Sequence, residues 1–170
     1  PDAIFCRDWN SFHDNGLVIL YPIKCKNRRL ERRADVIEDI GKQYEIKEVF
    51  SLAYGEDNEK FLEGSGAIVF DHANHKMYVN ESSRSNLELT QIVAKKLDYE
   101  AISFKAKDQN HKPIYHADVA LTIGTDWAII CDDAFEDKQD LENIRHSLKE
   151  TGHEIVSINF DQMNNFTANC

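Results

Sequence analysis

Four side chains of the sequence have the types and spacing that acid–base catalysis or cation binding requires. His116 and Asp118 lie two residues apart at the start of an apolar run. Glu63 stands directly before a Gly-Ser-Gly segment, and Asp8 lies close to the beginning of the chain. An imidazole beside a carboxylate suits general acid–base catalysis near neutral pH. Several carboxylates at one point suit a cation such as a guanidinium, because this planar group donates paired hydrogen bonds to a carboxylate.

The segment that carries His116 and Asp118 has the pattern of a β-hairpin. Apolar and polar residues alternate over 115–123, a Gly-Thr-Asp turn follows, and a second apolar run covers 127–131. Two such runs separated by a short Gly-containing turn predict two antiparallel strands. Residues two apart on a strand face the same side of the sheet, so we expect His116 and Asp118 to share one face.

Each of these side chains also has an ordinary structural interpretation. Asp8 could pair with the neighbouring Arg7 or cap a turn, and Glu63 could be a solvated loop acid. A histidine on an apolar strand, such as His116, is more often a hydrogen-bonded structural residue than a catalytic one. The basic run 28–33 is typical of a solvated helix face whose charges pair four residues apart. The residue pattern alone leaves these alternatives open.

The sequence predicts neither a metal nor an organic cofactor. The Gly-Ser-Gly segment at 64–66 is far too short a signal for a phosphate-binding loop. The histidines do not stand at ligand spacing with supporting cysteines or carboxylates. Those considered are His72, His75, His111 and His116. Cys6 and Cys131 lie in apolar runs, which favours positions in the core.

Composition and charge restrict the class of protein. The 170 residues fit one domain, and 42% hydrophobic and 29% charged residues are ordinary for a globular protein. The net charge of −10 argues against non-specific binding to nucleic acid or to an anionic membrane surface. No apolar run approaches the roughly 18 residues of a membrane span. Four scattered cysteines suit reduced thiols, so we expect a cytoplasmic protein.

The sequence predicts a single domain, residues 1–170, made of three repeats of about fifty residues. Each repeat has the order strand, turn, strand, helix, strand. They cover about 3–52, 66–107 and 116–160, with helices expected over 28–44, 86–97 and 137–151. Gly152 is expected to end the third of these helices, and Asp161 to cap a last one. One unit cannot bury both faces of its sheet, so the units must pack against each other. A ring of α/β blades is favoured, and a doubly wound sheet is the alternative.

Several segments resemble the arginine deiminase-like amidinotransferase family, and most closely its branch of citrulline-utilisation hydrolases. They are residues 1–13 (PDAIFCRDWNSFH), 21–22 (YP), 27–33 (NRRLERR), 61–66 (FLEGSG), 113–116 (PIYH) and 162–169 (QMNNFTAN). The resemblance covers the whole chain and rests on the order and spacing of these segments. It implies a pentein-type α/β propeller of ββαβ repeats, with about three of five blades present as a central fragment.

The resemblance also implies a chemistry. The family attacks a guanidino or ureido carbon with a Cys thiolate and forms a covalent intermediate. By resemblance, Glu63 and His116 are catalytic, and Asp8 and Asp118 bind the substrate. The family's nucleophile lies beyond the position of Cys170, so the fragment is expected to be inactive, and Cys170 is the alternative nucleophile.

Two alternatives to this hydrolase stay open: an amidinotransferase, in which an amine replaces water, and a non-catalytic propeller that serves as a binding module. The hydrolase branch has Asn-Asn where this chain has Arg7-Asp8, which makes Asp8 deiminase-like and leaves arginine-like and citrulline-like substrates open. The expected partner is a small guanidino or ureido molecule, without metal, organic cofactor, nucleic acid or membrane. A homodimer is allowed.

Overall fold

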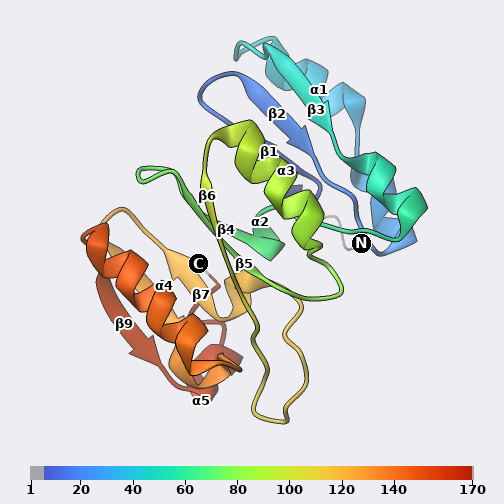
Figure 1. Cartoon of the computed structure of the whole chain (residues 1–170). Helices are drawn as coiled ribbons and strands as arrows, with labels where there is room; N and C mark the ends of the chain where they lie inside the picture. Colours follow the sequence, from blue (N-terminus) through green and yellow to red (C-terminus); the bar gives the residue numbers. More distant parts are fainter. Residues whose placement is uncertain (1–5, 170) are drawn as a thin grey trace.

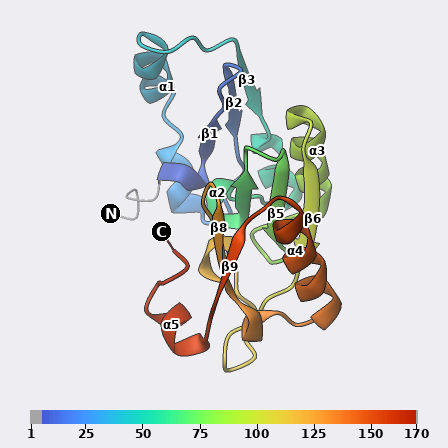
Figure 2. The ribbon, with the colours of Figure 1, turned by 90° about the vertical axis from the view of Figure 1, so that its left-hand side faces the viewer.

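Three small mixed sheets form the frame of the chain. The structure is a computed structural model that describes residues 6–169, and at Cys6 only the backbone. Among these residues the sheets have the strand orders β1-β2-β3, β4-β5-β6 and β7-β8-β9. The strands are β1 (Asn10–Phe12), β2 (Leu17–Leu20), β3 (Glu48–Ser51), β4 (Ile68–Asp71), β5 (Lys76–Asn80), β6 (Glu100–Phe104), β7 (Leu121–Ile123), β8 (Trp127–Cys131) and β9 (Glu154–Ile158). The three units follow one another across the molecule (Figures 1 and 2).

Each unit repeats one topology. Its first two strands form an antiparallel hairpin, and its third strand returns parallel to the second after a helix. The crossover helices are α1 (Ala34–Gly41), α3 (Leu87–Leu97) and α4 (Lys138–Glu150), and two short helices are α2 (Gly64–Ala67) and α5 (Phe160–Asn164). The ββαβ order confirms the predicted fold class. That residues 1–170 are the central part of a five-bladed propeller stays a prediction.

The second and third crossover helices join neighbouring units through shared hydrophobic cores. Leu89 of α3 lies in one buried cluster with Ile19 of the first sheet and Met77 of the second. Ile144 of α4 lies in another buried cluster with Tyr78 of the second sheet. Met77 and Tyr78 are neighbours on β5 and face opposite sides, so the middle sheet contributes to both cores. Burial of each such side chain stabilises the fold by about 1.5–3 kcal/mol.

The helix ends follow local sequence signals. The Asn86 side chain accepts hydrogen bonds at the start of α3, and Asp137 does so at the start of α4. Gly152 has φ +83°, as expected for the residue that ends α4. The prediction that Asp161 caps the last helix is wrong. Asn159 caps α5 through a reciprocal pair of hydrogen bonds, which places the start of the helix two residues earlier.

The helix expected over 28–44 is interrupted. A 3₁₀ turn covers Lys26–Glu31, two extended residues follow, and only then does α1 begin. Arg28 and Arg32 explain the interruption, because their guanidinium groups bind carboxylates outside α1. The partner of Arg32 is Glu56, which lies in the later 3₁₀ turn Ala53–Asn58. Apolar spacing alone could not predict these tertiary ion pairs.

The strand expected over 115–123 is shorter than its alternating pattern. Ala117–Val119 form a 3₁₀ turn, and β7 begins only at Leu121. Ala117 and Ala120 are fully buried and small, which lets the chain turn tightly against α2. His116 and Asp118 therefore do not lie side by side on one strand, and the predicted shared strand face is wrong.

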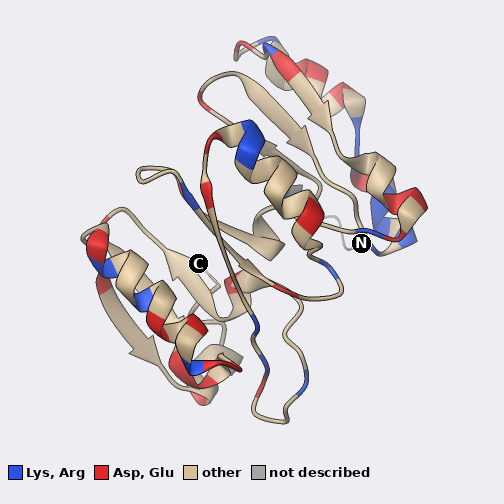
Figure 3. Ribbon diagram, in the orientation of Figure 1, with Lys and Arg blue, Asp and Glu red and all other residues tan. Residues whose placement is uncertain are grey.

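The surface carries charges of both signs. Acidic and basic residues are interspersed along α4 (Figure 3), whose buried residues Ile144, Ser147 and Leu148 are all uncharged. None of the helices in the described part of the chain is long and apolar enough to cross a membrane.

Candidate active site

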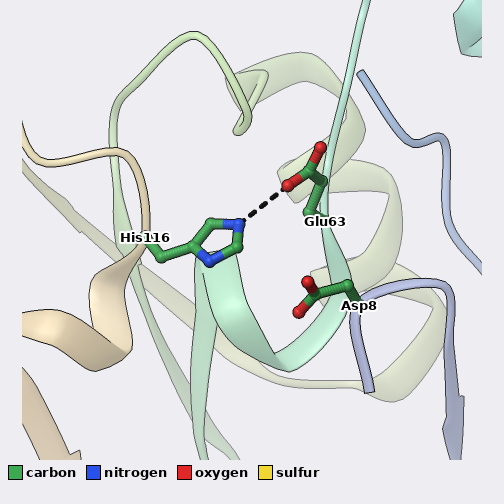
Figure 4. Close-up of side chains that lie close together, drawn as sticks. All are labelled: Asp8, Glu63 and His116. Carbon is green, nitrogen blue, oxygen red and sulfur yellow. Dashed lines mark hydrogen bonds and ion pairs between the residues drawn. The ribbon is translucent and has the colours of Figure 1, made fainter. Parts of the chain in front are cut away.

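Asp8, Glu63 and His116 meet at one buried point. Asp8 ends a 3₁₀ turn that starts at Cys6, Glu63 directly precedes α2, and His116 precedes the turn before β7. The three side chains point toward one another from these separate segments (Figure 4). One ligand atom of each lies within 4.8 Å of those of the other two. The residues are 3%, 0% and 8% exposed, so Glu63 is not a solvated loop acid.

Glu63 is the centre of the hydrogen-bond network. Its Oε2 lies 2.8 Å from His116 Nε2 and 3.0 Å from Arg84 Nη1. Its Oε1 accepts a hydrogen bond of 3.0 Å from the peptide N–H of Lys24. Burial by itself raises the pKa of Glu63, but the bonds from His116 and Lys24 and the charge of Arg84 outweigh it and hold the pKa below its ordinary value. Glu63 is therefore a carboxylate that orients His116.

Asp8 is held by an arginine that sequence reasoning placed in solvent. Arg28 Nη1 donates a 2.7 Å hydrogen bond to Asp8 Oδ2, and Arg28 Nε donates one of 2.9 Å to Glu31. The Arg28 side chain is only 9% exposed, so the interpretation of the whole basic run as a solvated helix face is wrong at this residue. Arg33 fits that interpretation, because it is exposed and pairs with Asp35.

Asp118 lies beside the cluster and has a partner of its own. Its Oδ2 accepts a hydrogen bond from the Arg7 guanidinium, which also contacts Asn169 Oδ1 at 3.3 Å. Its Oδ1 is buried and has no hydrogen-bond partner among the described residues. Burial raises the pKa of Asp118, and the charges of Arg7 and His116 oppose this rise. Arg7 thus pairs with Asp118, and Asp8 pairs with Arg28, not with Arg7.

Arg84 closes one side of the cluster. Besides its bond to Glu63, its guanidinium lies 4.6 Å from the centre of the Tyr115 ring, in a cation–π arrangement. The Arg84 side chain is 24% exposed, so it reaches from the buried carboxylate to the surface. The sequence offered no signal for Arg84, because its partners lie 21 and 31 residues away along the chain.

Two glycines allow these segments to approach closely. A Cβ on Gly64 would lie 2.2 Å from the carbonyl oxygen of Arg7, and Gly64 also has φ +37°. A Cβ on Gly66 would lie 2.7 Å from both Asp8 Oδ1 and His116 Nδ1. The Gly-Ser-Gly segment therefore gives room for the cluster, and it is not a phosphate-binding loop.

Gly66→Ala is expected to damage the site, because the added methyl group would lie between Asp8 and His116. We expect the free energy of unfolding to fall by about 1–3 kcal/mol, the usual cost of overpacking. Chemical denaturation measures this change. Gly41→Ala is the matched control, since its Cβ meets only Ile46 at an ordinary 3.5 Å. Equal stability of the two variants would contradict the close approach at Gly66.

The charges of the site favour an organic cation. Four carboxylates and three guanidinium groups gather here, which leaves one negative charge apart from His116. They are Asp8, Glu31, Glu63, Asp118, Arg7, Arg28 and Arg84. Arginines already bind the carboxylates, so we assign no metal to the cluster. A planar donor of several hydrogen bonds matches the remaining acceptor atoms.

No described cysteine has the character of a nucleophile at this cluster. Cys131 is buried at the end of β8, and burial raises the pKa of its thiol to about 11. Cys25 is half-buried and is not among the residues whose ligand atoms gather with those of Asp8, Glu63 and His116. Cys170 lies outside the described residues, as does the side chain of Cys6.

A family model for eukaryotic N,N dimethylarginine dimethylhydrolase matches residues 1–170. The chain belongs to this family. The match confirms the resemblance to guanidino-group-modifying enzymes, and the citrulline-utilisation branch stays a prediction. A comparison with curated proteins found no match to this chain.

Solved structures show that the fold is shared. The chain is similar to the N-terminal domain of ArgZ, a cyanobacterial arginine dihydrolase bound to its substrate, with a TM-score of 0.77 and 21% identity over 99% of this chain and 58% of that chain. The complex of AgrE with L-arginine has a TM-score of 0.73 and 20% identity, over 98% of this chain and 23% of that chain. An adduct of a dimethylarginine dimethylaminohydrolase has a TM-score of 0.51 and 13% identity, over 98% of this chain and 75% of that chain. The chain thus spans just over half of the ArgZ domain.

Proposed function

We propose that the chain forms the acid–base and substrate-binding part of a Cys-dependent hydrolase that cleaves C–N bonds of guanidino compounds. The observation that carries the proposal is the buried meeting of Asp8, Glu63 and His116 from three separate segments. A binding module has no need to bury an imidazole and two carboxylates together. Membership of the dimethylhydrolase family and the fold shared with an arginine dihydrolase support the proposal.

The substrate that fits the charges is arginine-like. Its guanidinium would donate hydrogen bonds to Asp8 and to the free Oδ1 of Asp118. Arg84 donates one hydrogen bond to Glu63 and is partly exposed, so its other N–H groups suit the carboxylate of an amino acid. A citrulline-like substrate lacks the positive charge and uses these acceptors less well.

His116 would move the protons of the reaction. Glu63 holds its Nε2, so Nδ1, which faces Gly66, is the atom for proton exchange. A thiolate adds to the guanidino carbon, the C–N bond breaks, and the leaving amine takes a proton from the His116 imidazolium. Water then gives one proton to His116 and attacks the thiouronium carbon, and the adduct breaks its C–S bond and releases the thiolate. The second proton of the water passes to solvent as the carbonyl group of the product forms. The lowered pKa of Glu63 keeps a negative charge beside the imidazolium throughout.

The thiolate itself is proposed to come from outside the described residues. Cys131 is buried with a raised thiol pKa, and Cys25 is not part of the cluster. An ArgZ variant is covalently bound to a reaction intermediate, which supports a covalent mechanism for this chain. We therefore propose that residues 1–170 alone are inactive, and that the nucleophile lies beyond Cys170 in a longer polypeptide.

Hydrolysis of arginine, agmatine, citrulline and methylated arginines by this chain, and by a version extended at both ends, tests the proposal. We expect turnover only in the extended version, and a loss of about 10²–10⁴-fold in kcat in His116→Ala, the range of general acid–base catalysis. His146→Ala is the matched control, because His146 is exposed on α4. Activity in the short chain that is lost in Cys170→Ala would contradict the placement of the nucleophile.

Two other outcomes would change the functional class. Transfer of the amidino group to an added amine, without hydrolysis, would indicate an amidinotransferase. No turnover and no binding of any of these compounds by either version would favour a non-catalytic binding module.

A further inference from the structure

Asp118 has two oxygens in different situations. Oδ2 accepts a hydrogen bond from Arg7, whereas Oδ1 is buried and has no donor among the described residues. The Asp118 side chain is 8% exposed, so water has little access to donate the missing hydrogen bond to Oδ1. An unpaired buried carboxylate oxygen is costly, and such atoms in folded proteins call for an explanation. A bound ligand that donates an N–H group would satisfy Oδ1.

The short turn Cys6–Asp8 serves two carboxyl groups at once. Asp8 enters the cluster with Glu63 and His116, while its neighbour Arg7 pairs with Asp118. The backbone of the turn is fixed by α2, because Gly64 comes too close to the carbonyl oxygen of Arg7 for any side chain to fit. The Arg7 side chain is 39% exposed, so its guanidinium approaches Asp118 from the solvent side.

We propose that Arg7 is a positioning residue that occupies Oδ2 of Asp118, so that Oδ1 is left to accept an N–H group of the guanidino substrate. The identity of this ligand rests on the proposed function, whereas the effect of Arg7 on Asp118 does not. Arg7 itself needs no contact with the substrate.

The charged groups around Asp118 determine how removal of Arg7 acts. Burial and the charge of Asp8 raise the pKa of Asp118, and the charges of Arg7 and His116 and a hydrogen bond from the Asn169 side chain lower it. Loss of Arg7 removes the stronger of the two opposing charges, so the Asp118 pKa rises further. Asp118 is then protonated up to a higher pH, and the binding of a cation is lost at a higher pH as the solution is acidified.

Arg7→Met and Arg7→Lys test this role in the 170-residue chain by two measurements. One is the pH titration of the Asp118 carboxyl carbon by ¹³C NMR, and the other is the affinity for L-arginine as a function of pH. We expect Arg7→Met to raise the Asp118 pKa and to weaken arginine binding about twofold at the new pKa, where half of Asp118 is protonated, and further below it. Arg7→Lys keeps the charge, so its Asp118 pKa and its affinity for L-arginine should both be close to those of wild type. Arg33→Met, which removes an exposed arginine, should change neither.

The outcomes separate this inference from the proposed function. An unchanged Asp118 pKa in Arg7→Met would overturn the role of Arg7. Tighter arginine binding by Arg7→Met would overturn it too, since Arg7 would then compete with the ligand. If L-arginine binds to no variant at any pH, the proposed function fails, and the Asp118 titration alone decides the role of Arg7.

Discussion

Replacement of Glu63 by Ala is expected to destabilise the fold by about 3–5 kcal/mol, the range for removal of one partner of a buried ion pair. Glu63 is fully buried and accepts hydrogen bonds from His116, Arg84 and the peptide N–H of Lys24. Each donor would be left without its acceptor, and burial makes that loss costly. Urea denaturation at neutral pH measures the change.

Glu63→Gln separates charge from shape, and Glu142→Gln on the exposed side of α4 is its matched control. The folded-state pKa of Glu63 lies below its ordinary value of 4.5. A group with a lowered pKa contributes stability that is complete above its unfolded pKa and is lost as the pH falls through the folded pKa. We therefore expect the difference in free energy of unfolding between wild type and Glu63→Gln to be largest at neutral pH and to shrink below about pH 4.5. A gap that does not depend on pH would contradict the ionised state of Glu63.

Arg28→Met is expected to have the second largest effect, again about 3–5 kcal/mol. The variant keeps the length of the side chain but leaves the buried Asp8 without the guanidinium that binds its Oδ2. Glu31 loses the same partner. We expect a lower denaturation midpoint with an unchanged dependence on denaturant, because the extent of the fold stays the same.

Arg33→Met is the control for Arg28→Met, since both arginines lie in one basic run and Arg33 is 62% exposed. Exposed ion pairs contribute about 0–1 kcal/mol, so this variant should be close to wild type. If the two variants were equally stable, the burial of the Arg28–Asp8 pair would be wrong.

Local signals in the sequence predicted much of the fold. Caps at Asn86 and Asp137 and the left-handed Gly152 have short-range causes, and so do the antiparallel hairpins. The sequence analysis named Asp8, Glu63, His116 and Asp118 as candidate site residues, and the structure brings the first three together. Residues that can act as acid, base or acceptor stand out by type, and the resemblance to a family placed them together.

The partners of these residues could not be predicted, because they are set by tertiary structure. The pairs Arg28–Asp8, Arg84–Glu63 and Arg7–Asp118 join positions 20, 21 and 111 residues apart. An arginine in a basic run has the same local pattern whether it is solvated or buried. The turn at Ala117 was missed for a related reason, since alanine fits a strand pattern and a tight buried turn equally well.

A crystal structure of the 170-residue chain grown with L-arginine tests the central claim most directly. We predict that the guanidinium lies within hydrogen-bond distance of Asp8 and Asp118 Oδ1, beside His116, and that the amino-acid carboxylate lies at Arg84. L-arginine bound elsewhere, or a cluster without ligand at a concentration that saturates binding in solution, would contradict a guanidino site built by Asp8, Glu63 and His116.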